Sequence, residues 1–147
     1  MRVAALQAIG DLVACPFPEK CRGAASECIA ELVGHRDDNI LPVAAFYRAE
    51  TTLNRFAKLV LDEAPSVRCQ LQYVIADWLL RLPDKYDHEG RLAPYLLSGL
   101  NDTNVELQSF CLETLNQLGR AYAAENQDDV SLLEMILYTV LNFSRCI

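Results

Sequence analysis

The sequence predicts an all-α fold, an α-solenoid in which antiparallel helix pairs stack side by side. Apolar residues recur at helical spacing along nearly the whole chain of 147 residues, whereas the alternation typical of strands is almost absent. A unit of apolar helix, Asp, polar turn and second apolar helix also occurs twice, at Leu61–Arg68 and at Leu100–Gln108. Repetition of one supersecondary unit is typical of solenoids, whose repeats share a continuous core.

The predicted helices follow one another with short polar breaks. Pro65 suits the first turn of a helix, where its missing N–H costs nothing, and Pro83 ends a helix because its ring cannot follow a helical turn. Polar stretches over 37–39, 84–90 and 124–129 are expected to be connectors. The apolar stripes predict helices over 1–12, 24–33, 53–61, 67–82, 92–100, 107–122 and 133–141.

These helices are expected to form about four pairs, of which the first and the last are incomplete. The opening helix aligns with the helix that begins at Val67 at an offset of 66, and that helix aligns with the one at Leu107 at an offset of 40. The offsets fit two repeats of about 33 residues and one longer repeat. No long polar linker interrupts the series, so we expect residues 1–147 to form one array. Because terminal repeats normally carry a polar outer face, we also expect this array to be part of a longer solenoid, with apolar surface exposed at both ends.

The pattern resembles the HEAT repeat. The stretch 96–102 matches the first helix and turn of that repeat, and Met1-Arg2, Val67-Arg68 and Leu107-Gln108 match the start of the second helix. In HEAT proteins the turn Asp and the second-helix Arg form a ladder between neighbouring repeats. The alternative is that these side chains are solvated charges worth under about 1 kcal/mol each. The resemblance implies a structural ladder of Arg2, Asp62, Arg68, Asp102 and Gln108, in which the uncharged Gln108 is the weakest member.

Residues 62–130 are similar to a narrower family, the HEAT-repeat axonemal dynein assembly factors. The matching blocks are 77–86, with the sequence Asp-Trp-Leu-Leu-Arg-Leu-Pro-Asp-Lys-Tyr, and the stretches 92–102 and 124–130. This resemblance implies a non-catalytic, cytoplasmic scaffold for the preassembly of axonemal dynein arms. It also implies dynein heavy and intermediate chains and co-chaperones as partners, and no cofactor. A HEAT or armadillo scaffold of another pathway, nuclear transport or phosphatase regulation, is the alternative.

The residues themselves disfavour catalysis, because the groups that catalysis needs are scattered. The two histidines, His35 and His88, fall in different predicted connectors, and the six glycines form no phosphate-binding loop. Pairs of acidic residues fall in turns, where helix capping explains them. The sequence therefore predicts a protein that is not an enzyme.

Cysteines, charge and hydropathy disfavour three further kinds of site. The six cysteines include no CxxC pair and read as reduced thiols, and the spacing of Cys21, Cys28 and His35 separates them by about 10 Å per step along a helix, too far to share a zinc ion. The net charge of −7 opposes nucleic-acid binding. No apolar run reaches the roughly 18 residues of a membrane span.

The best candidate for function is a partner-binding surface on the second helices, on the flank away from the core stripe. Tyr73 is its strongest member, because an exposed Tyr can anchor an interface, whereas Trp78 shares its helical phase with the core. A solvated face with no partner and a rigid spacer are the alternatives. The candidate residues are Tyr73, Asp77, Arg81, Glu113, Gln117 and Arg120, with Gln7 and Asp11 at equivalent places on the opening helix.

Overall fold

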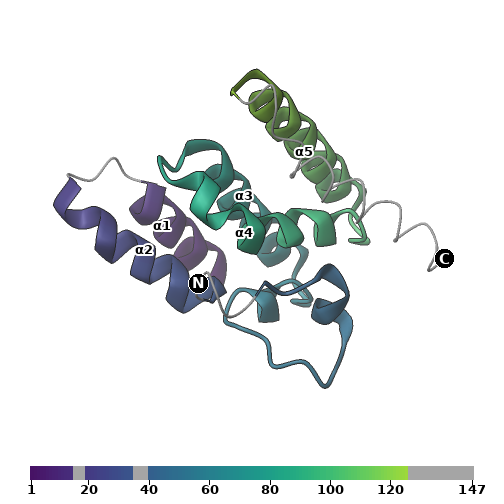
Figure 1. Ribbon diagram of the computed structural model, residues 1–147. Helices are drawn as coiled ribbons and strands as arrows, with labels where there is room; N and C mark the ends of the chain where they lie inside the picture. The colour runs from purple at the N-terminus through teal and green to yellow at the C-terminus, as the bar shows by residue number, and fades with distance from the viewer. Residues whose placement is uncertain (15–18, 35–39, 126–147) are drawn as a thin grey trace.

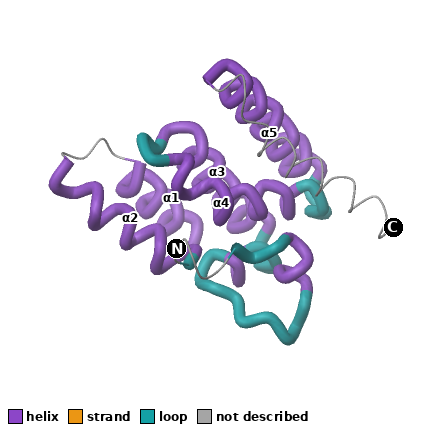
Figure 2. Tube along the Cα trace, in the orientation of Figure 1, coloured by secondary structure: helices purple, strands orange, loops and turns teal. Residues whose placement is uncertain are grey.

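A computed structural model describes residues 1–14, 19–34 and 40–125 of the chain. These ranges contain helices and loops and no strand (Figure 2), so the predicted all-α solenoid is confirmed. The elements are α1 (Arg2–Ala14), α2 (Glu19–Val33), the 3₁₀ helices η1 (Val43–Tyr47) and η2 (Ala57–Leu59), α3 (Pro65–Arg81), α4 (Lys85–Gly99) and α5 (Val105–Glu125).

The second helices α1, α3 and α5 form a row, in which α3 packs against both of its neighbours (Figure 1). The offset of 66 residues between α1 and α3 was predicted to span two repeats, but the two helices pack directly against each other, so it corresponds to one step of the stack. Gly10 permits this close approach, because a Cβ atom there would lie 2.8 Å from Cγ2 of Val74.

The helix predicted over 53–61 is wrong, although Phe56, Ala57 and Val60 of this segment are buried. Asn54 holds this segment in 3₁₀ turns: its Oδ1 accepts from the Ala57 N–H at 2.8 Å, and its Nδ2 donates to the Val33 carbonyl at 3.0 Å. The backbone N–H of Phe56 bonds outside the segment, to the Leu32 carbonyl at 3.1 Å. A short polar side chain that hydrogen-bonds to nearby backbone groups offers the chain an alternative to a helix. Here the hydrogen bonds to α2 stabilise that alternative.

The connector predicted over 84–90 is also wrong, because α4 begins at Lys85. His88, placed in that connector by its polar neighbours, is instead a core residue with 2% exposure. Since the Arg91 guanidinium can only donate to Nδ1 of His88, the proton of the neutral ring lies on Nε2, which donates to Asp84 at 3.1 Å. Burial lowers the pKa of His88. Arg91 also donates to the Gly34 carbonyl, which ties α4 to the end of α2.

Trp78 lies in the core, as its helical phase predicted, with 0% exposure. Its ring stacks on Phe56 with centroids 5.6 Å apart, and its Nε1 donates to the Gly10 carbonyl at 3.4 Å. One side chain of α3 therefore contacts both α1 and the irregular segment between α2 and α3. At the other end of the stack, a Cβ atom on Gly99 of α4 would overlap Sγ of Cys111 in α5, so glycine is required there for helix contact.

Candidate functional site

The turn that precedes α3 is organised by Asp62. Its carboxylate accepts from the Ala64 N–H at 2.9 Å and from the guanidinium of Arg2, which reaches it from α1. Its backbone carbonyl accepts from Nη1 of Arg68 at 2.7 Å. The Asp62 side chain is 5% exposed, whereas that of Arg2 is 63% exposed. The carboxylate of this ion pair is therefore buried, and the guanidinium lies at the surface.

The turn that precedes α5 repeats this arrangement around Asp102. Its carboxylate accepts from the Asn104 N–H at 2.8 Å, and its carbonyl accepts from Nε2 of Gln108 at 2.5 Å. Arg68 donates two parallel hydrogen bonds to the same carboxylate, from Nε at 2.6 Å and from Nη2 at 2.9 Å. Such two-point pairs fix geometry as well as charge. This contact, with Arg68 13% and Asp102 8% exposed, lowers the pKa of Asp102.

Four of the five residues of the expected ladder therefore meet in two successive ion pairs, and the fifth, Gln108, bonds to its own turn. Arg2 of α1 meets Asp62 before α3, and Arg68 of α3 meets Asp102 before α5. Gln108 donates to the carbonyl of Asp102, just as Arg68 donates to the carbonyl of Asp62. Each arginine thus links one second helix to the turn that starts the next.

The candidate surface on α3 consists of side chains that already contact one another. Tyr73 is 47% exposed and lies edge-on to Phe110 of α5, with ring centroids 4.5 Å apart. Asp77 and Arg81 form an ion pair one helical turn apart, with Oδ2 and Nη2 2.6 Å from each other. The hydrogen bond and the charge of Asp77 raise the pKa of Arg81.

On α5 the other three candidates, Glu113, Gln117 and Arg120, are exposed. Gln7 on α1 is exposed as well. The Tyr73–Phe110 contact connects the α3 part of this surface to α5, so the predicted residues border one continuous row of helices.

The thiols that can be described are free. Cys28 and Cys69 are half-buried and Cys111 is fully buried, where burial raises the pKa of its thiol to about 12. Within the described ranges no three His, Cys, Asp or Glu residues gather in a way that could hold a metal ion. The predicted helix over 133–141 and the histidine at position 35 lie outside the described residues. In the described part no helix has the length and apolar character needed to cross a membrane.

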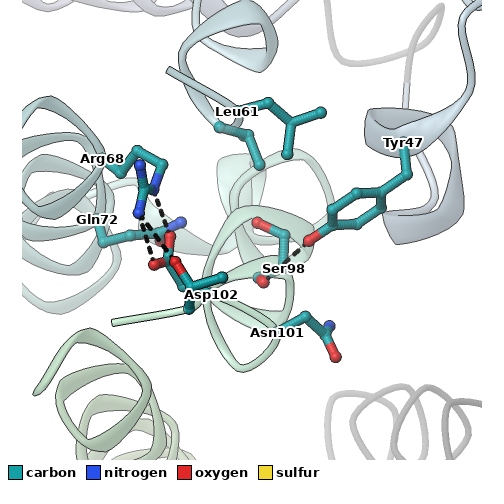
Figure 3. Close-up of a pocket in the computed structure, with 10 residues that line it drawn as sticks. Tyr47, Leu61, Arg68, Gln72, Ser98, Asn101 and Asp102 are labelled. Carbon is teal, nitrogen blue, oxygen red and sulfur yellow. Dashed lines mark hydrogen bonds and ion pairs between the residues drawn. The ribbon is translucent and has the colours of Figure 1, made fainter. Parts of the chain in front are cut away.

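A cavity of about 220 Å³, which the sequence analysis did not predict, lies beside the second ion pair (Figure 3). It is lined by residues from the start of α3, from the end of α4 and from the turn before α5. Tyr47 and Leu61, from the segment between α2 and α3, complete the lining. The hydroxyl of Tyr47 donates to the Ser98 carbonyl at 3.1 Å. A signal was present in Gln72, a polar residue next to the core position Leu71, but its partner elements could not be known from spacing alone.

Comparison with known proteins places this architecture in a family. A family model described as "Dynein axonemal assembly factor 5-like, TPR repeats" matches residues 38–131. Dynein axonemal assembly factor 5 of Homo sapiens is 33% identical over 81 residues, which is 55% of this chain and 10% of that protein. The proteins of the same name from Xenopus laevis and Mus musculus are each 31% identical over the same shares.

The chain thus spans about a tenth of the length of the curated relatives it matches. No solved structure is detectably similar to it. TPR and HEAT repeats are both stacked helix pairs, so the TPR description agrees with the observed fold. Because the family model matches well over half of its length, the chain belongs to the dynein axonemal assembly factor 5-like family of helical-repeat proteins.

Proposed function

We propose that this chain is a non-catalytic scaffold segment that works in the cytoplasmic preassembly of axonemal dynein arms. The observation that carries the proposal is the family match over 38–131, which includes both Asp turns and the three helices α3, α4 and α5. The relatives are named as axonemal dynein assembly factors, and the chain matches about a tenth of each. The role proposed here is that of one repeat segment within such a factor.

The ion pairs support a scaffold role because they fix how the second helices are spaced. Arg68 binds both the carbonyl of Asp62 and the carboxylate of Asp102, so it joins two consecutive turns with one rigid side chain. Arg2 makes the corresponding contact one step earlier. In this proposal Gln108 holds its own turn, and the ladder keeps the row of α1, α3 and α5 from sliding.

We further propose that protein partners bind the row formed by these helices. Tyr73 offers an aromatic anchor, held in one orientation by Phe110, and aromatic anchors carry much of the energy of protein interfaces. Asp77 and Arg81 beside it form an ion pair with each other, so a partner would meet two neighbouring opposite charges. Glu113, Gln117 and Arg120 would supply the polar rim. The proposed partners are dynein heavy or intermediate chains and the co-chaperones that accompany them.

A pulldown from ciliated cells tests both parts of the proposal. The tagged chain is expected to recover dynein heavy or intermediate chains, detected by immunoblot. Tyr73→Ala is expected to lower recovery about tenfold, the effect of losing a modest interface anchor. Tyr86→Ala is the matched control, because Tyr86 is similarly exposed (42%) but lies on α4.

The possible outcomes separate the function from the surface. Failure of the unmodified chain to recover any dynein chain would contradict the dynein role, and recovery of nuclear import cargo or phosphatase subunits instead would favour the alternative pathway. Equal recovery by Tyr73→Ala and by the unmodified chain would leave the function but remove the proposed surface.

A further inference from the structure

The side of α1 that is turned away from α3 is apolar and exposed. Gly10 faces α3, and Ala8 and Leu12 each lie two residues from it, which is about 200° around an α-helix. Ala5 lies about one turn before Ala8 on the same side. All three are exposed, and Leu12, at 58%, is one of the large apolar side chains that the fold leaves in water. We call Ala5, Ala8 and Leu12 the free face of α1.

The helices α1 and α3 occupy equivalent places in the stack, and their arginines fix the register between them. Arg2 and Arg68 each bind the Asp of the turn that starts the next second helix. These two arginines are 66 positions apart, the same offset that aligns the two helices in sequence. Each residue of α1 therefore corresponds to the residue of α3 that lies 66 positions later.

By this register, the free face of α1 corresponds to the face with which α3 binds α1. Val74 and Trp78 of α3 meet α1 at Gly10, the first by close packing and the second through its hydrogen bond to the carbonyl. Leu71 lies in the same helical row, and none of the three side chains is more than 3% exposed. The face that α3 buries against its neighbour is thus also present on α1, where the described residues leave it exposed. The corresponding residues of α1 are Ala5, Ala8 and Leu12.

The outer side of α5 does not offer the surface that would complement this face. Gln108 holds its turn as Arg68 does, so α3 and α5 are in register at an offset of 40. The place of Gly10 in α1 is therefore taken by Ala76 in α3 and by Asn116 in α5, which is exposed. A helix that packed there as α3 packs on α1 would bury the Asn116 amide, which is costly without a hydrogen-bond partner. A second copy of this chain is thus a poor occupant in a head-to-tail stack.

Two copies joined through α1 alone would form a small interface. Because α1 has 13 residues, its free face is about 20 Å long. Stable interfaces between separate proteins usually bury about 800 Å² on each partner, more than one face of a short helix provides. A helix of the same chain needs no such area, because the connection raises its effective concentration beside α1. The size of the free face therefore favours an occupant from the same chain.

We propose that the free face of α1 binds the second helix of a preceding repeat in a longer chain. That helix packs its apolar face on Ala8 and Leu12 as α1 packs on Val74 and Trp78, which makes α1 an internal element of the row. The segment matched in the human relative is 10% of that protein, so a protein of this family has room for such a repeat. The proposal concerns how the row continues and does not depend on the dynein role.

Carbene footprinting read by mass spectrometry tests the proposal on the natural protein at its full length. The chain supplies a matched control, because Leu12 and Leu61 are the same residue type and are 58% and 55% exposed. In the chain of residues 1–147, at a dilution where light scattering reports a monomer, the two leucines are expected to be labelled to a similar extent. In the full-length protein Leu12 is expected to be labelled at least about fivefold less than Leu61, because a close-packed interface excludes the reagent.

A variant at the same position tests the contact by its effect on local stability. Leu12→Gln is expected to leave the chain of residues 1–147 unchanged, because glutamine is a good helix former and the site is exposed. In the full-length protein it would bury an amide without a partner, so hydrogen exchange of the α1 backbone amides is expected to become about tenfold faster. Leu61→Gln is the control and is expected to leave exchange in α1 unchanged in both proteins.

Four results would overturn the proposal. The first three are equal labelling of Leu12 and Leu61 in the full-length protein, unchanged exchange of α1 in full-length Leu12→Gln, and a natural protein with no helix pair before α1. The fourth is protection of Leu12 that is lost on dilution together with a fall in mass, because it would identify a second copy as the occupant. Recovery of dynein chains in the pulldown is unaffected by any of these results.

Discussion

The turns before α3 and before α5 share the same pattern of hydrogen bonds to the backbone. They differ in how far the side chain that closes each turn extends. In each, an Asp carboxylate accepts from the N–H two residues later, and the side chain six residues later donates to the Asp carbonyl. At the first turn that side chain is Arg68, which also extends to the next Asp. At the second it is Gln108, whose amide is shorter and uncharged.

The difference shows that holding a turn and linking two turns are separable tasks. A glutamine is sufficient to hold its own turn, whereas linking requires the length and the several donors of an arginine. The N-termini of α3 and α5 also differ in how they are capped. Asn104 caps α5 by accepting from the Glu106 N–H at 2.9 Å, while α3 begins with Ala64 and Pro65 and has no side-chain cap. The first turn therefore depends more on Arg68.

Arg68→Gln makes the first turn like the second and is expected to have the largest effect. The new amide can still donate to the Asp62 carbonyl, as Gln108 does in the other turn, but Asp102 loses its buried partner. Breaking such a pair costs about 3 kcal/mol of unfolding free energy. Urea denaturation followed by circular dichroism measures this loss.

Arg2→Gln is the matched control, because it removes the equivalent arginine one step earlier. The side chain of Arg2 is 63% exposed, so its loss is expected to cost under about 1 kcal/mol. Equal losses for the two variants would show that burial of the second pair has no energetic consequence.

Low pH is expected to destabilise the second turn by protonating Asp102, and this loss of stability is expected to be smaller than that caused by Arg68→Gln. The pKa of its carboxyl is lowered in the folded protein, mainly by the hydrogen bond from Arg68, so the unfolded chain takes up this proton first as pH falls. The stabilisation is complete above the unfolded pKa of about 3.9 and is lost as pH falls through the folded value.

In Arg68→Gln the pKa of Asp102 is expected to rise, because burial then acts on the carboxylate without the guanidinium. Titration of the carboxyl carbon by NMR measures this shift. An unchanged pKa in the variant would mean that Arg68 does not stabilise the charge of Asp102.

Much of the stack could be predicted from sequence because it depends on local signals. The two Asp turns, Pro65 at the first position of α3 and the helical phase of Trp78 all act within a few residues of the chain. The segment over 53–61 could not, since its periodicity is helical and only the bonds of Asn54 to α2 decide against a helix.

Burial of polar residues was the second source of error. His88 made its surroundings look like a connector, yet Asp84 and Arg91 satisfy its ring inside the protein. The cavity at Gln72 was missed for a related reason. It exists only where α3, α4 and the irregular segment meet, and no spacing within one helix can report that.

The central claim is that Arg68 links the two turns more strongly than Arg2 links α1 to the first. Two double-mutant cycles measure this difference directly, one with Arg68→Gln and Asp102→Asn and one with Arg2→Gln and Asp62→Asn. The predicted coupling free energy is about 2 kcal/mol for the first cycle and below about 0.5 kcal/mol for the second. Couplings of equal size, or a first coupling near zero, would contradict the account.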